Sequence, residues 1–77
     1  MQNTQYIRFL VNTLQWARMM KFEVTFHKDH YKVRDLDAYK AETMLISNEY
    51  TEESQRNLEY ISDVVNRRVD EIYDTAY

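Results

Sequence analysis

The chain contains neither glycine nor proline among its 77 residues. Without glycine it lacks the phosphate-binding GxGxxG and GxxxxGK loops and the GxSxG nucleophile elbow. Any turn that needs a positive φ must use Asn, Asp or Lys instead. The sequence therefore predicts regular elements joined by short connections, with little room for an elaborate active-site loop.

Length and composition predict a single small globular domain over residues 1–77. The chain is 44% hydrophobic and 30% charged, which is typical of a folded protein. It has no cysteine, so disulfides and cysteine-based zinc sites are excluded. No apolar run reaches the length of a membrane span, and the N-terminus lacks the features of a signal peptide. We therefore expect a cytoplasmic protein.

Residues 4–20 have the pattern of a helix, with Asn3 or Thr4 as its cap. The apolar residues cover roughly 220° of a helical wheel, whereas a one-sided surface helix needs a stripe only somewhat over ~100° wide. We expect the hairpin and the last helix to cover one part of this arc, which comprises Ile7, Leu10, Leu14 and Ala17. The remaining strip consists of Phe9, Trp16 and Met20. This strip should contact a second copy of the chain, as a homodimer, or a target protein.

Residues 22–34 alternate apolar and polar side chains, as a β-hairpin does. A turn at residues 28–29 gives the pairs Glu23 with Arg34, Val24 with Val33, Thr25 with Lys32, Phe26 with Tyr31 and His27 with His30. All apolar residues then share one face, and a slip of one residue would scramble both faces. Asp29 tolerates a positive φ better than Lys28 does, and a wider loop over residues 27–30 would keep the same register.

Two further helices are predicted, over residues 37–48 and 51–75. Asp37 is a plausible N-cap of the first, with Leu36 and Ala41 as a hydrophobic staple. Thr51 is a plausible N-cap of the second. The apolar face of this last helix consists of Leu58, Ile61, Val65, Val69, Ile72 and Ala76. The predicted fold is therefore α+β with the order α-β-β-α-α, in which one antiparallel hairpin packs with three helices.

The charges divide the chain into a basic and an acidic half. Residues 1–40 hold seven Lys or Arg and four Asp or Glu, a net charge of +3, and residues 41–77 hold three and nine, a net charge of −6. Two alternative functions follow from this division. The hairpin residues Lys28, Lys32 and Arg34 could bind nucleic acid, although a pI near 5.3 argues against it. The acidic face of the last helix could imitate DNA through Glu52, Glu59, Asp63, Asp70 and Asp74, although Arg56 and Arg67 in that face are typical of a salt-bridged solvent face.

Nothing in the sequence predicts catalysis or metal binding. His27, Asp29 and His30 are better explained as the ends of a turn than as a zinc site, which needs three or four fixed ligands. None of the three serines sits in a sequence pattern that implies a nearby catalytic base. We therefore predict no enzyme, no metal and no cofactor. Tyr60 and Tyr73 flank the apolar face of the last helix, and tyrosine is enriched at interfaces.

These features predict a small non-enzymatic protein-binding regulator or inhibitor. Its interface candidates are Phe9, Trp16, Met20, Tyr60 and Tyr73. In size, acidity and lack of motifs the chain resembles accessory proteins of bacteriophages and mobile elements. The resemblance implies a protein that blocks a host or defence protein in the host cytoplasm.

Overall fold

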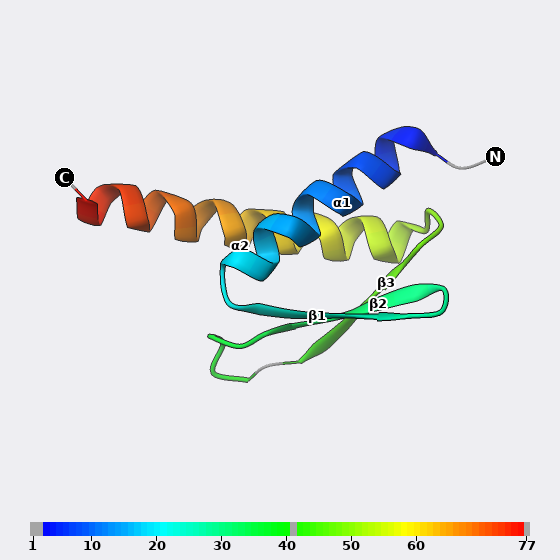
Figure 1. Ribbon diagram of the computed structural model, residues 1–77, viewed down its shortest axis with the longest axis horizontal. Helices are drawn as coiled ribbons and strands as arrows, with labels where there is room; N and C mark the ends of the chain where they lie inside the picture. Colours follow the sequence, from blue (N-terminus) through cyan, green and yellow to red (C-terminus); the bar gives the residue numbers. More distant parts are fainter. Residues whose placement is uncertain (1–2, 41, 77) are drawn as a thin grey trace.

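The computed structural model describes residues 3–40 and 42–76. Five elements follow one another: α1 (Thr4–Met19), β1 (Phe22–His27), β2 (His30–Asp35), β3 (Thr43–Ser47) and α2 (Glu52–Ala76). The strands form one antiparallel sheet in the order β1-β2-β3, and both helices lie on the same side of it (Figure 1). The α+β class is confirmed, but the order is α-β-β-β-α and differs from the prediction.

The predicted hairpin is present, with every pair in the predicted register from Glu23↔Arg34 to His27↔His30. Arg34 and Glu23 lie 3.7 Å apart on the outer face of the sheet. The connection is the two-residue turn, and the wider loop is not needed. In this two-residue turn the positive φ, 21°, belongs to Lys28 and not to Asp29, contrary to our expectation. Lys21, between α1 and β1, is also left-handed, with a φ of 66°.

The prediction of a helix over residues 37–48 is wrong. Residues 36–40 form turns and bends, and Thr43–Ser47 form β3, which pairs with β2. Asp37 caps no helix; its N–H donates instead to Asp35 Oδ1 at 3.0 Å. Ala41, half of the expected staple, lies outside the described residues. The sheet thus gains a third strand whose Met44 and Ile46 pack on the core side.

Both remaining helices begin at the predicted caps. Asn3 Oδ1 accepts the N–H of Tyr6 at 3.2 Å, which identifies Asn3, and not Thr4, as the cap of α1. Thr51 Oγ1 accepts the N–H of Ser54 at 3.0 Å at the start of α2. Both bonds satisfy amide groups that a helix leaves without a partner in its first turn.

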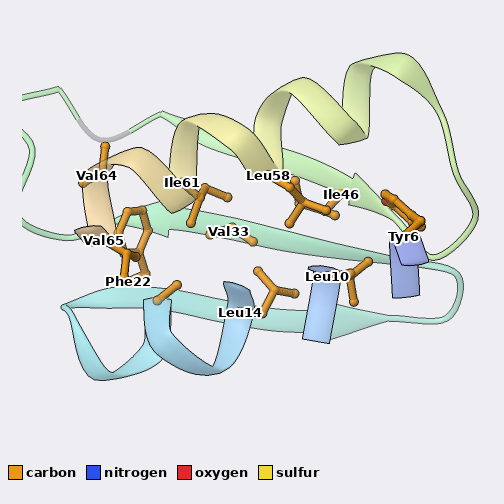
Figure 2. Close-up of a cluster of buried hydrophobic side chains, with 11 residues drawn as sticks. Tyr6, Leu10, Leu14, Phe22, Val33, Ile46, Leu58, Ile61, Val64 and Val65 are labelled. Atoms are coloured by element: carbon orange, nitrogen blue, oxygen red, sulfur yellow. The ribbon is translucent and has the colours of Figure 1, made fainter. Parts of the chain in front are cut away.

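The core lies between the two helices and the sheet (Figure 2). Its most deeply buried large side chains come from every layer and comprise Leu10, Val33, Ile46, Leu58 and Ile61. Leu14 and Ala17 are also buried, as predicted for α1, whereas Ile7 is only partly buried. The core therefore uses the centre of the apolar arc of α1 and leaves its margins for other contacts.

The 25-residue helix α2 is longer than the layer that it covers. Its C-terminal part extends past the sheet and past α1 (Figure 1). The apolar stripe that buries Leu58, Ile61 and Val65 continues into this extension. There Val69 is only half-buried and Ile72 is 57% exposed. Val69 still packs against the edge of the core, whereas more than half of Ile72 is left in water.

Candidate protein-binding surfaces

The end of the domain beyond the core carries a group of apolar side chains, of which Met19, Met20 and Ile72 line a groove. We call this surface the open end and define it by Met19, Met20, Leu36, Ile72 and Tyr73. Except for the half-buried Met20, all of these residues are exposed. The groove has a volume of about 620 Å³ and is lined by Met19, Met20, Lys21, Asp37, Arg68, Glu71 and Ile72.

Arg68, which lines this groove and is partly buried, forms an ion pair with the buried Asp35. Arg68 Nη2 donates to both carboxylate oxygens of Asp35 at 2.8 Å, and its Nη1 donates to the carbonyl of Met20 at 2.7 Å. The guanidinium also lies over the Phe22 ring, 5.1 Å from its centroid. Arg68 thereby ties α2 to the end of β2 and to the C-terminus of α1. The other charged residues that line the groove are Lys21, Asp37 and Glu71.

The extension of α2 itself is acidic. Asp70, Glu71 and Asp74 lie in the extension of α2, and its last turn has no basic residue. Carboxylates near the C-terminus of a helix oppose its dipole. The extension is therefore both apolar along one stripe and electrostatically unfavourable by itself. Asp70 and Asp74 lie on the face of α2 opposite to Ile72 and do not line the groove.

The residues of the predicted strip on α1 line two different grooves. Phe9 is half-buried and Trp16 is 50% exposed. Both line a separate groove of about 210 Å³ between the helices, with Asn12, Thr13, Ser62, Val65 and Asn66. Met20 lies apart from them, at the open end. The structure thus places Phe9 and Trp16 in one groove and Met20 in another.

The two tyrosine candidates lie on opposite flanks of α2. Both are exposed, but Tyr60 lies alongside the core and Tyr73 lies in the extension. A separation of thirteen residues corresponds to about 20 Å along a helix. Of these two candidates, only Tyr73 belongs to the open end.

The basic hairpin residues lie where they were predicted. Lys32 and Arg34 are exposed on the outer face of the sheet, which neither helix covers, and Lys28 is exposed in the turn. Arg34 is engaged by Glu23, so one of the three cations is partly neutralised. The face also carries Leu45, which is 51% exposed.

The two histidines stack on each other beside the turn. Their ring centroids are 5.4 Å apart with an interplanar angle of 14°. His30 Nδ1 lies 2.9 Å from Asp29 Oδ1, and this hydrogen bond is the main reason that the pKa of Asp29 lies below its usual value. Among residues 3–40 and 42–76, no three His, Cys, Asp or Glu side chains are grouped so that they could hold a metal ion.

The acidic candidates for DNA mimicry, Glu52, Glu59, Asp63, Asp70 and Asp74, are all exposed on α2. Arg56 Nη2 lies 3.8 Å from Glu52 Oε2, one of the ion pairs expected in this face. Arg67 instead donates its Nε–H to the backbone carbonyl of Asp63, at 3.4 Å. Gln55 donates to Glu59 at 3.1 Å. The carboxylates of Glu52 and Glu59 therefore make local contacts of the kind that a solvated helix face makes.

Sequence reasoning missed the Asp35–Arg68 pair and the groove beside it. The two residues are 33 positions apart, and no local spacing connects them. The only signal was an acid at the inner-face position opposite Phe22, where the alternation calls for an apolar residue.

Within the described residues, neither helix combines the length and apolarity needed to cross a membrane. Comparison with protein-family models, curated proteins and solved structures finds no match to the chain.

Proposed function

We propose that the chain is a small non-enzymatic protein-binding regulator or inhibitor, which acts in the cytoplasm and binds its partner through the open end. In the form that its size and acidity favour, it serves a bacteriophage or mobile element by blocking a host or defence protein. The partner we infer has an apolar segment that enters the groove beside Ile72.

The exposure of Ile72 is the observation that supports this proposal most. Ile72 continues the core stripe of α2, yet 57% of it is in water. Burying an exposed Ile or Met side chain completely contributes about 1.5–3 kcal/mol. Association costs an estimated 4–15 kcal/mol in lost freedom. Covering Met19, Leu36, Ile72 and Tyr73 together is therefore of the right size to offset much of that cost, whereas covering one of them is not.

Two matched variants test the proposal. Ile72→Asp and Leu45→Asp make the same change at positions of similar exposure, 57% and 51%, on different surfaces. Tagged wild type and both variants would be used for affinity purification from the native host, with quantitative mass spectrometry. The affinity of the partner so identified would then be measured with purified proteins.

We expect Leu45→Asp to keep the wild-type affinity and Ile72→Asp to weaken it at least tenfold, with unchanged melting temperatures for both. A partner that binds the Ile72→Asp variant as well as the wild type would contradict a role for the open end. So would a partner that is lost only with Leu45→Asp.

Binding of nucleic acid through the hairpin is the second candidate, because no helix covers the outer face that carries Lys32 and Arg34. Its affinity would come mainly from phosphate contacts and would fall steeply with salt. Salt-dependent retention on DNA that is lost in a Lys28→Ala, Lys32→Ala double variant would favour this candidate. If neither the wild type nor the double variant is retained on DNA at low salt, the result would favour the protein-binding proposal.

A further inference from the structure

The two edge strands of the sheet differ in whether their outward backbone groups are hydrogen-bonded. Side chains of the helices close the edge of β3. The N–H of Ser47 donates to Ser54 Oγ at 2.8 Å, Asn57 Nδ2 donates to the carbonyl of Leu45 at 3.1 Å, and Tyr6 Oη donates to the carbonyl of Ser47 at 2.6 Å. An edge occupied in this way cannot accept another strand at these positions.

The edge of β1 has no such cover. The N–H of Leu36 donates to the carbonyl of Lys21 at 2.9 Å, and backbone bonds between antiparallel strands recur at every second residue. Glu23, Thr25 and His27 therefore bond to β2, and the N–H and C=O groups of Val24 and Phe26 point to the other side. No hydrogen bond within residues 3–40 and 42–76 reaches these four outward groups.

Apolar side chains accompany these free backbone groups. Phe26 faces the core side of the sheet but is 56% exposed at the end of β1. The helix α1 packs against β1. On a helical wheel, Val11 and Ile7 lie on the flank of α1 opposite to Phe9 and Trp16, which face α2. Val11 is exposed and Ile7 is half-buried. A strand beside β1 would thus lie under an apolar helix flank.

We propose that the edge of β1 binds an extended peptide segment of a partner protein, which adds a fourth strand at Val24–Phe26. Main-chain hydrogen bonds supply the affinity in this mode, and alternate side chains supply the specificity. The inward residues of the peptide are apolar and pack against Phe26 and Val11. Its outward residue beside Glu23 is basic, because opposite charges across two strands are favourable. This site is separate from the open end and does not depend on it.

A second copy of the chain fits this edge less well than an extended peptide. Paired strands lie about 4.8 Å apart, whereas a helix with its side chains is about 10 Å wide. Because α1 packs on β1, two copies joined through their β1 strands would bring their α1 helices too close together. The fitting partner is therefore a strand with no helix above it.

The experiment uses a displayed library of random ten-residue peptides selected on the immobilised chain. Selected peptides would be measured against wild type, Phe26→Asp and the control Leu45→Asp. We expect peptides with alternating apolar residues, at least tenfold weaker for Phe26→Asp and unchanged for Leu45→Asp. On binding, amide hydrogen exchange should slow at Val24 and Phe26, while Thr25 and His27 are already protected. A selection that yields no binder, or yields binders indifferent to Phe26→Asp, would overturn the proposal.

Methylation of the peptide backbone gives a readout that needs no change in the protein. N-methyl groups at alternate peptide residues, those whose N–H faces β1, should abolish binding. The same groups at the intervening residues should leave it within about twofold, since those N–H groups face solvent. A peptide that is equally sensitive at all positions, or that loses binding with Ile72→Asp, does not add to the β1 edge, and either result would refute the assignment.

Discussion

At the scale of single residues, the fold depends on a few positions where a polar group is buried with a specific partner. Asp35 is buried with Arg68, and Ser54 is buried with the N–H of Ser47. Within the described residues, no deeply buried side-chain N or O atom lacks a hydrogen-bond partner. Removing one member of such a pair costs more than the bond itself contributes, because the other member stays buried without a partner. These positions, with the apolar core, set the stability.

The first residue-scale prediction compares two neighbours on α2. Val65 is 4% exposed and faces the core, so Val65→Asp buries an unpaired charge and should unfold or nearly unfold the domain. Asp63 is exposed, so Asp63→Asn should change the free energy of unfolding by less than about 0.5 kcal/mol. Urea unfolding followed by circular dichroism measures both. Similar curves for the two variants would contradict the orientation of α2.

The second residue-scale prediction concerns how the ionisation of Tyr6 makes the stability depend on pH. Burial raises the pKa of the Tyr6 hydroxyl above its ordinary value, and a hydrogen bond with Ser54 offsets part of this rise. The folded state therefore holds the proton more tightly than the unfolded state does, and this contribution to stability is lost as the pH rises above about 10. Thermal unfolding of wild type and Tyr6→Phe between pH 8 and 11 tests it. The wild type should lose more stability than the variant over this range, and parallel profiles would exclude the effect.

At the scale of elements, the sequence predicted what local periodicity determines and failed where a distant partner decides. The hairpin register was predictable because a single alignment placed every apolar residue opposite another. The helix over 37–48 was not, because Ala, Lys, Glu, Met and Leu in this segment favour a helix locally. Pairing with the free edge of β2 overrode that preference, since Met44 and Ile46 complete the core face of the sheet. Only Thr43 and Ile46 gave a local signal for a strand.

The element-scale prediction is that the side chains on the β3 edge prevent self-association as well as stabilise the fold. Ser54→Ala leaves the N–H of Ser47 without its acceptor, at a cost of about 1–3 kcal/mol. Adding Asn57→Ala uncovers the carbonyl of Leu45, and the double variant should aggregate on warming before it unfolds, as light scattering would show. Gln55→Ala, which only removes an exposed contact with Glu59, is the control. A double variant as stable and monodisperse as this control would disprove the protective role.

At the scale of the whole molecule, the candidate site was predictable only in part. Met20 and Tyr73 were identified from the sequence and lie at the open end, but Met19, Leu36 and Ile72 were not selected. Ile72 was assigned to the core face, and its exposure follows from the length of α2 relative to the sheet, which no local pattern encodes. Phe9 and Trp16 form a separate groove because α2 crosses their side of α1.

The whole-molecule prediction is a homodimer that forms through the groove lined by Phe9 and Trp16. Trp16 is the only tryptophan and is half-exposed in the single chain. If a second copy covers it, sedimentation should show a dimer at micromolar concentration, and Trp16 emission should shift to the red on dilution. Trp16→Ala should give a monomer, whereas Tyr60→Ala, an exposed aromatic on the other flank of α2, should not. A concentration-independent monomer with constant emission would contradict the dimer.

The extension of α2 has a further consequence, for the kinetics of binding. Three carboxylates and the negative end of a helix dipole meet at one end of an elongated molecule, so the domain would approach a basic surface with that end first. Such steering increases the association rate and weakens as salt is added. The apolar contacts of Ile72 and Met19 would instead govern how slowly the complex dissociates. A domain built in this way would associate quickly with a basic surface through the charge of the helix and dissociate slowly through its apolar stripe.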